Sequence, residues 1–446
     1  MTLGPALRRR LHWLPGALGA VGPFLLCGSV GCAPPALKDA GLGPSDVIVG
    51  LTVSPESVAV FAGDQSSFQA SGRTTDGSLI VNPSVSWRAT GGSITSRGQY
   101  RAGGAPGSFR VVVTDQAGRI ADTAVVTVVR RPLRYHADAR HFLIGAAAGI
   151  GALRSDAGYP STLAREYNSV VAENAMKVDA LHPAAGQYTF EEADQLVAFA
   201  AANHMVVHGH TLVWYTSLPT WLSQGSFTNT QIAGILKEYV TTVVTHFRGQ
   251  VSSWDVVNEP IADAGGLLRP SIWLTSMGSG YIDSAFVWAH AADPAASLYV
   301  NDYGIEGINP KSNALLTLVR DLKARGVPVN GVGLQSHLTT APPTDLQQNL
   351  ARFAAAGLDT RISEMDVRIP NAADSTELAR QATVYRTALD ACLRTPRCTG
   401  LTTWGFTDRY SWIPEAFPGL GRALPMDSNL NPKPAYNALL EGLQDE

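Results

Sequence analysis

Charge is scarce in this chain and nearly balanced. Asp, Glu, Lys and Arg make up only 16% of the 446 residues, and 34 basic against 37 acidic side chains leave a formal net charge of −3. A chain without an excess of basic side chains has no electrostatic reason to bind nucleic acid or an anionic membrane surface. We therefore expect neither as a partner, whereas a neutral polysaccharide is compatible with this balance.

Long apolar runs are also scarce, because beyond the N-terminus no segment is apolar enough to span a membrane. At the N-terminus, three arginines at positions 8–10 precede a mostly apolar stretch over residues 11–30, which is the pattern of an export signal. Pro15, Pro23 and several glycines interrupt this stretch, so a stable membrane-spanning helix is the weaker interpretation. We predict a signal peptide over residues 1–32 and an exported protein, either extracellular or attached to a bacterial cell envelope.

Cysteine is the third scarce feature, with four in the whole chain. Cys27 falls within the predicted leader, and Cys32 ends the segment Ser29-Val30-Gly31-Cys32, which resembles a bacterial lipobox. Lipidation of Cys32, with membrane attachment, and ordinary cleavage nearby both stay open. Cys392 and Cys398 are separated by five residues in a chain predicted to be exported, so we predict a disulfide between them, with two buried free thiols as the alternative.

The length predicts two domains after the leader and a linker over residues 33–46. Residues 47–130 carry short β-prone runs broken by Gly, Asp, Asn and Ser, which predict a small all-β sandwich. Segments such as Val85-Ser86-Trp87 resemble bacterial Ig-like domains. We expect Trp87 in the core of this sandwich rather than on its surface as a platform for sugars.

Strand-like and helical patterns alternate from about residue 138 to the C-terminus. The strand-like runs are residues 142–147, 169–172, 206–211, 251–257, 297–301, 331–334, 359–362 and 400–404. The helical stretches include residues 191–203, 230–247, 311–326, 345–356 and 375–391. Eight repeats of strand and helix predict an α/β fold, a (β/α)8 TIM barrel over residues 138–446, reached by a short connector over residues 130–136.

Two glutamates follow apolar strand-like runs that lie far apart in the sequence. Glu259 follows the fourth run and Glu364 follows the seventh. Barrel strands bring their C-terminal ends to one face, where active sites of this fold form. A pair of carboxyls there is what glycoside hydrolysis needs, since one protonates the leaving oxygen and the other acts as nucleophile or base. In a retaining enzyme the two carboxyls lie roughly 5–5.5 Å apart.

Seven segments around these strand ends carry a resemblance to a known family. They are Ala172-Glu173-Asn174-Ala175-Met176-Lys177, Gly209-His210-Thr211-Leu212-Val213-Trp214, Trp254-Asp255-Val256-Val257-Asn258-Glu259-Pro260, Asn301-Asp302-Tyr303, Gly333-Leu334-Gln335-Ser336-His337-Leu338, Arg361-Ile362-Ser363-Glu364-Met365-Asp366-Val367 and Trp404-Gly405-Phe406-Thr407-Asp408-Arg409-Tyr410-Ser411-Trp412. In this order they resemble glycoside hydrolase family 10, the retaining endo-1,4-β-xylanases. The resemblance implies hydrolysis of internal bonds of xylan without a cofactor or a metal, with Glu259 as acid/base and Glu364 as nucleophile.

The resemblance also assigns supporting roles. It implies that Asn258 bonds the sugar 2-hydroxyl, that His337 bonds Glu364, and that Asp366 orients the imidazole. The residues that it assigns to sugar binding are Glu173, Asn174, Lys177, His210, Trp214, Tyr303, Gln335, Trp404 and Trp412. Polar groups are expected at the edges of the sugars and aromatic rings at their faces.

Three positions depart from the family pattern. Tyr215 stands where the family usually has histidine, His208 replaces a common arginine, and Gly304 stands where asparagine is common. His208 and His210 point to the same face of a strand, but no third metal-ligand motif accompanies them. Action on β-1,4-glucan or an aryl cellobioside, and a non-catalytic polysaccharide-binding surface protein, are the alternative functions.

Overall fold

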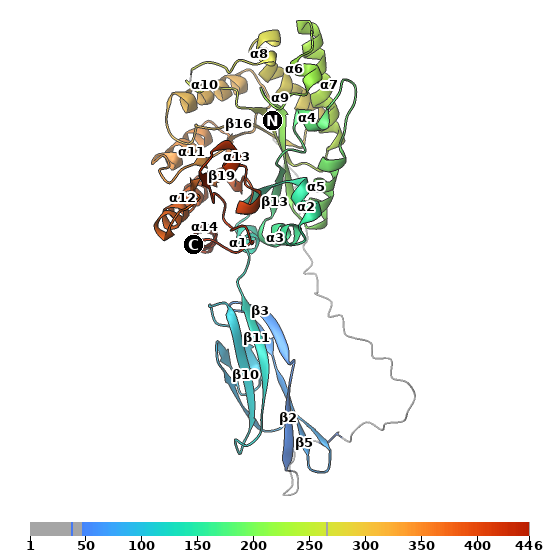
Figure 1. Ribbon diagram of the computed structural model, residues 1–446, viewed down its shortest axis with the longest axis vertical. Coiled ribbons are helices and arrows are strands. Elements are labelled where there is room, and N and C mark those ends of the chain that lie inside the picture. The colour runs from blue at the N-terminus through green and yellow to red at the C-terminus, as the bar shows by residue number, and fades with distance from the viewer. Residues whose placement is uncertain (1–36, 39–46, 265, 446) are drawn as a thin grey trace, which may run out of the picture. The chain divides into compact units, whose positions relative to one another are not determined.

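The computed structural model describes residues 37–38, 47–264 and 266–445, and the chain divides into two compact units between Arg130 and Arg131 (Figure 1). The predicted signal peptide, its Cys32 and most of the predicted linker lie outside the described residues. Over the ranges that are described, no helix combines the length and the apolar character needed to cross a membrane.

The N-terminal unit consists of β-strands in three small sheets. One sheet has the order β1 (Leu37–Lys38), β6 (Leu79–Val81), β5 (Gln69–Thr74) and β2 (Ile48–Ser54). The second has the order β3 (Ser57–Phe61), β11 (Ala121–Val129), β10 (Gly107–Asp115) and β7 (Val85–Ala89). The third has the order β4 (Gln65–Ser67), β9 (Gln99–Arg101) and β8 (Ser93–Ile94).

The two larger sheets of this unit share one apolar core. Side chains alternate along β11, so that Val126 and Val128 are buried between exposed neighbours. They join a cluster with Val111 of β10 and with Val53 of β2 in the other sheet. Trp87 packs against this cluster and is half-buried, so it contributes to the core without being enclosed by it. This is the packing of a β-sandwich.

The second unit is built on a closed ring of eight parallel strands. They are β12 (Leu143–Ala148), β13 (Ser169–Ala172), β14 (Val206–Val213), β15 (Ser253–Asn258), β16 (Ser297–Asp302), β17 (Gly331–Leu334), β19 (Asp359–Val367) and β21 (Cys398–Thr403). Each strand pairs with the next, β17 pairs with β19, and β21 pairs with β12 to close the ring. The predicted (β/α)8 barrel is thereby confirmed.

Helices surround the ring (Figure 1). The longer ones are α5 (Glu191–Ala202), α7 (Asn229–His246), α9 (Gly280–Ala292), α10 (Pro310–Ala324), α11 (Leu346–Ala355), α12 (Ser375–Leu393) and α14 (Pro434–Gln444). The shorter elements are α1 (Leu133–Ala139), α2 (Ile150–Ser155), α3 (Gly158–Glu166), α4 (Val178–Leu181), α6 (Thr220–Ser223), α8 (Ile272–Met277), η1 (Asp408–Tyr410) and α13 (Ile413–Ala416), with strands β18 (His337–Leu338), β20 (Ile369–Pro370) and β22 (Leu420–Gly421). Capping boxes begin two of the longer helices, with Thr228 before α7 and Asn309 before α10.

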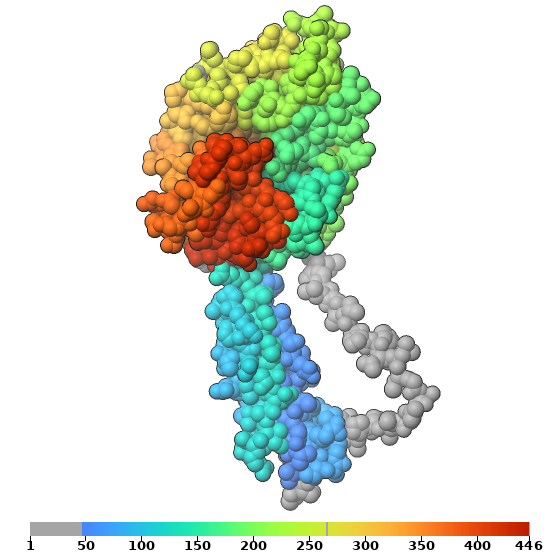
Figure 2. All heavy atoms as spheres, viewed as in Figure 1, coloured from blue at the N-terminus to red at the C-terminus, as the bar shows by residue number. Residues whose placement is uncertain are grey.

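Helix α1 occupies a stretch that the sequence pattern presents as a connector. Its Leu133 and Ala137 are fully buried, and the helix contacts α14 and β12. The barrel unit therefore begins before residue 138, because these side chains complete its core. Figure 2 shows the C-terminal segment, in red, lying against the green early part of the same unit.

A disulfide joins Cys392, near the end of α12, to Cys398, the first residue of β21. The two Cα atoms lie 5.2 Å apart, within the range that a disulfide requires. The short loop between helix and strand is therefore covalently closed.

Candidate active site

Two buried carboxyls meet at the C-terminal face of the barrel. Glu259 follows the last residue of β15 and is 7% exposed, whereas Glu364 lies within β19 and is 4% exposed. The two strands are separated in the ring by β16 and β17, which contribute the polar groups between the two carboxyls. Because the strands are parallel, all these groups reach the same end of the barrel.

Glu364 is held by an amide and lies beside two imidazoles. The Asn301 Nδ2 donates to Glu364 Oε1 at 2.6 Å, and His337 Nε2 lies 3.2 Å from Glu364 Oε2. His210 Nδ1 lies 3.7 Å from Oε1. Burial alone would raise the pKa of Glu364, but His210 and His337 outweigh it and hold that pKa below its usual range. Glu364 is therefore kept ionised.

The His337 ring lies between two carboxylates. Its Nδ1 lies 2.8 Å from Asp366 Oδ2, and its Nε2 faces Glu364. Since both nitrogens face acceptors, both carry protons, and the ring is an imidazolium. Burial opposes this charge, but Asp366 and Glu364 raise the pKa of His337 to about 10. The same Asp366 oxygen accepts from Trp412 Nε1 at 2.9 Å, so it orients a ring of the cavity wall as well.

Glu259 has different partners and an unusual backbone. Its φ of 56° lies in the left-handed region, which residues other than glycine rarely adopt. Its N–H donates to the Asn301 carbonyl at 2.7 Å. Trp214 Nε1 donates to Glu259 Oε2 at 2.9 Å, and Gln335 Nε2 donates to Glu259 Oε1 at 2.8 Å. Both carboxylate oxygens thus accept from neutral donors.

Side-chain amides connect the surroundings of the two carboxyls. Asn301 Nδ2 donates to Asn258 Oδ1 at 2.8 Å as well as to Glu364. Ser363 Oγ donates to Asn301 Oδ1 at 2.6 Å, which fixes the orientation of that amide. A shift at Asn301 would therefore disturb both carboxyls, because its backbone binds Glu259 and its side chain binds Glu364.

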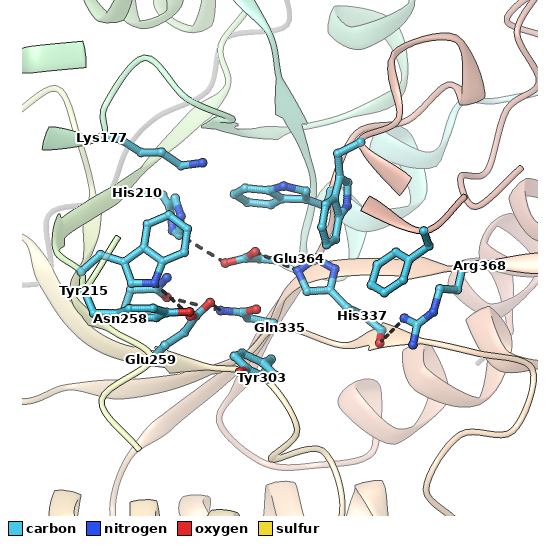
Figure 3. Close-up of a pocket in the computed structure, with 14 residues that line it drawn as sticks. Lys177, His210, Tyr215, Asn258, Glu259, Tyr303, Gln335, His337, Glu364 and Arg368 are labelled. Carbon is cyan, nitrogen blue, oxygen red and sulfur yellow. Dashed lines mark hydrogen bonds and ion pairs between the residues drawn. The ribbon is translucent and has the colours of Figure 1, made fainter. Parts of the chain in front are cut away.

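The carboxyls open into a cavity of about 460 Å³. Its lining residues are Lys177, His210, Trp214, Tyr215, Asn258, Glu259, Tyr303, Gln335, His337, Glu364, Arg368, Trp404, Trp412 and Phe417. In the view of Figure 3, Lys177 and Arg368 lie on opposite sides of the two glutamates. Charged groups at the carboxyls and aromatic rings on the walls suit a ligand with hydroxyl edges and apolar faces.

Most of the predicted site residues line this cavity, and three do not. Asp366 lies behind His337, as its predicted orienting role requires. Glu173 is half-buried beside the cavity, and burial raises the pKa of its carboxyl although Lys177 opposes the shift. Asn174 is exposed and accepts from Lys177 Nζ at 2.8 Å. Asn174 therefore orients Lys177, which itself reaches the cavity.

Four residues of the site were not among the predicted ones. Asn301 stands within a quoted motif near the end of a strand, but its partners Glu259 and Glu364 are distant in the sequence. Tyr215 was noted only as a departure from the family pattern. Arg368 lies two residues beyond Asp366 along an extended segment, so side-chain alternation could have identified it. Phe417 comes from the loop between α13 and β22 and had no signal in the sequence.

His208 and His210 share one buried aspartate. His208 Nε2 and His210 Nδ1 lie 3.0 and 2.9 Å from Asp255 Oδ2, and His208 Nδ1 lies 2.7 Å from Ser253 Oγ. Burial opposes the charge on Asp255, but the two imidazoles lower its pKa. His210, Asp255 and Glu364 also place possible metal-ligand atoms within 4.8 Å of one another. Hydrogen bonds and ion pairs within the protein already explain the positions of these atoms.

Comparison with known proteins agrees with this geometry. The sequence model of Glycosyl hydrolase family 10 matches residues 133–442. Endo-1,4-beta-xylanase B of Thermotoga neapolitana is 43% identical over 320 residues, which cover 71% of this chain and 92% of that protein. Endo-1,4-beta-xylanase A of Phanerodontia chrysosporium is 42% identical over 301 residues, covering 67% of this chain and 73% of the relative.

Solved structures give the same result for the barrel unit. Native xylanase 10B of Thermotoga maritima aligns with a TM-score of 0.69 at 43% identity, covering 70% of this chain and 98% of that one. Xylanase 10B of Thermotoga petrophila RKU-1, solved in complex with xylobiose, aligns with a TM-score of 0.69 at 42% identity, covering 70% and 97%.

Proposed function

Because the chain belongs to glycosyl hydrolase family 10, we propose that it is an endo-1,4-β-xylanase that hydrolyses internal bonds of xylan with retention of configuration. The observation that carries this proposal is the difference between the two carboxyls of the cavity. Glu364 lies beside two imidazoles that favour its ionised form, and Glu259 accepts from neutral donors. A retaining glycosidase needs an ionised nucleophile and a separate proton donor.

The reaction follows from these two environments. Glu364 attacks the anomeric carbon while Glu259 gives its proton to the leaving glycosidic oxygen, and a covalent glycosyl-enzyme forms as that C–O bond breaks. Glu259, now ionised, takes a proton from water, and the hydroxyl displaces Glu364 from the anomeric carbon. Gln335 and Trp214 keep the Glu259 carboxyl in place through both steps, because their N–H groups can donate to either protonation state.

The other residues bind the sugars. Asn258 lies between the two carboxyls, where its amide can bond the 2-hydroxyl of the reacting sugar. Trp404 is 8% exposed and packs with Trp412, so the two rings form one apolar wall of the cavity. Lys177 and His210 add polar groups on the side of β13 and β14. Tyr303 contributes a ring from the end of β16.

Sugar release from xylan and from carboxymethylcellulose tests the substrate. We expect rapid release of reducing ends from xylan and little from carboxymethylcellulose, with Glu364→Gln as the inactive control. Comparable rates on both polymers would favour a β-1,4-glucanase. Binding to xylan without release would favour a non-catalytic polysaccharide-binding protein. NMR of the first product of xylohexaose should show the β-anomer, and an initial α-anomer would contradict retention.

We also propose that the protein is exported and that its N-terminal unit is an Ig-like spacer. The basic and then apolar pattern of residues 1–32, which predicts a leader, and the disulfide between Cys392 and Cys398 support export. Lipidation of Cys32 would attach the enzyme to a membrane. Mass spectrometry of the mature N-terminus tests this, because a diacylglyceryl group on Cys32 supports the anchor and an unmodified N-terminus contradicts it.

A further inference from the structure

The segment after Glu259 turns back on itself through one arginine. Arg269 Nε donates to the carbonyl oxygen of Glu259 at 3.1 Å, and its Nη2 donates to the carbonyl oxygen of Ile261 at 3.0 Å. The Arg269 N–H donates to the carbonyl of Pro260 at 2.7 Å. The side chain of Arg269 is only 12% exposed. One residue therefore binds three consecutive carbonyls, beginning with that of the proposed acid/base.

Further contacts hold the guanidinium itself. Its Nη2 lies 2.7 Å from Asp263 Oδ1 and donates to the Tyr303 hydroxyl at 3.0 Å. Its Cζ lies 4.7 Å from the centre of the Tyr215 ring and 5.5 Å from that of Tyr303. A planar guanidinium can make such bonds and ring contacts at once, which a lysine ammonium cannot.

Glu259 needs this support because of its backbone. A φ of 56° is unfavourable for a residue with a Cβ and persists only where the surroundings impose it. The Asn301 carbonyl fixes the Glu259 N–H, and Arg269 fixes the Glu259 carbonyl. Trp214 and Gln335 fix the carboxyl only if the backbone presents it at the correct place.

We propose that Arg269 is the positioning residue for proton donation by Glu259, an inference that rests on the proposed acid/base role of Glu259. Arg269 acts through the Glu259 backbone, and its loss misplaces the carboxyl relative to the leaving oxygen. The step most affected is the transfer of the proton to that oxygen. The kcat/KM for substrates that need this proton should fall. The kcat/KM for substrates whose leaving group departs without it should stay nearly unchanged.

Two aryl β-xylobiosides separate these cases. Phenol is a poor leaving group that needs the proton, whereas 2,4-dinitrophenol leaves without it. We expect Arg269→Met to lower kcat/KM for phenyl β-xylobioside about 10- to 100-fold, the range for a catalytic group displaced by about 1 Å. The value for 2,4-dinitrophenyl β-xylobioside should stay within about threefold, since its cleavage needs little general acid catalysis. Arg325→Met is the matched control, because Arg325 also binds an aspartate, Asp283, but follows α10 outside the cavity.

The outcomes distinguish this inference from the proposed function. Equal losses on both substrates, or no loss on either, would overturn the role of Arg269. Glu259→Ala, measured with the same substrates, should show a larger selective loss, and its failure to do so would overturn the acid/base assignment instead. If Arg269→Met does not fold, as judged by thermal unfolding, Arg269→Lys takes its place. The lysine variant should show a smaller loss that is still confined to the phenyl substrate, and an unselective change would count against the proposal.

Discussion

Glu364 and Glu259 lie in one cavity, yet they differ in backbone conformation and in the partners of their carboxyls. Glu364 lies within a strand, so its backbone is fixed by the sheet, and its carboxyl lies near the imidazoles of His337 and His210. Glu259 follows a strand with a left-handed backbone, and its carboxyl accepts from an indole and an amide. The backbone of Glu364 is fixed by the sheet, whereas that of Glu259 is held by hydrogen bonds to Asn301 and Arg269.

The difference matches what each carboxyl must do. A nucleophile has to be ionised at the start of the reaction, and neighbouring positive charge favours that form. A proton donor has to be held where it can reach the leaving oxygen, and the Trp214 and Gln335 donors hold the Glu259 carboxyl in one orientation. The barrel thus surrounds two residues of the same type with different neighbours.

Replacing Glu364 should have the largest effect. Glu364→Ala removes the proposed nucleophile, so kcat on xylan should fall on the order of 10⁶-fold, as for the nucleophile of a serine protease. Azide should restore cleavage of an activated aryl xylobioside by attacking from the vacated side, giving the α-glycosyl azide. Product analysis by NMR checks this, and a β-azide would show that Glu364 is not the nucleophile.

Replacing Glu259 should have the next largest effect, with the opposite stereochemistry. Glu259→Ala should lower kcat/KM for phenyl β-xylobioside by about 10²- to 10⁴-fold, the contribution of general acid catalysis. Azide should here react with the glycosyl-enzyme and give the β-glycosyl azide. An α-azide from this variant would show that Glu259, and not Glu364, is the nucleophile.

Asp366→Asn should affect only the surroundings of Glu364, and it should lower activity less than replacing either glutamate. Removing this charge lowers the pKa of His337 from about 10, so the imidazolium is lost at a lower pH. Above the new His337 pKa the ring is neutral, so Glu364 loses one of the positive charges that offset the burial of its carboxylate. The alkaline limb of the pH profile of kcat/KM should therefore move to lower pH, with a loss of about 10- to 100-fold on that side. The acidic limb should stay in place, because His337 is protonated there in both proteins.

The pH profile with an activated and a poor leaving group is the measurement for Asp366→Asn. Both substrates should show the shifted alkaline limb, because both need the nucleophile. A shift seen only with the poor leaving group would mean that Asp366 acts on proton donation. The surroundings of Glu364 and Glu259 would then not act independently.

Removal of the N-terminal unit should have the smallest effect on the chemistry. A chain that begins at Arg131 keeps α1 with its buried Leu133, and a barrel closes its own sheet without an added strand. We expect kcat on soluble xylooligosaccharides to stay within about twofold, because the lining residues of the cavity lie between Lys177 and Phe417. A large fall with the barrel still folded would show that the N-terminal unit shapes the cavity.

The sequence predicted more of the residues around Glu364 than of those around Glu259. Glu364 and Asp366 stand two residues apart on one strand, so alternation places both side chains on one face. The family resemblance implied that His337 contacts both. Arg269 lies ten residues beyond Glu259 in a loop, where no periodicity relates the two. Asn301 joins both sides, and its role depends on the neighbours of β16 in the ring, which are distant in the sequence.

The barrel and the meeting of the two glutamates follow from local patterns in the sequence, because alternating strands and helices impose one topology and parallel strands bring their C-terminal ends to one face. Most residues of the cavity wall were predicted from the family resemblance of the segments at these strand ends. The three-dimensional structure was needed to show that α1 belongs to the barrel core and that Arg269 holds the Glu259 backbone. It was also needed to show that Asn301 bonds both the Glu259 backbone and the Glu364 carboxylate. These features depend on contacts between segments far apart in the chain, or on loop geometry, and neither is encoded in the periodicity of any one segment.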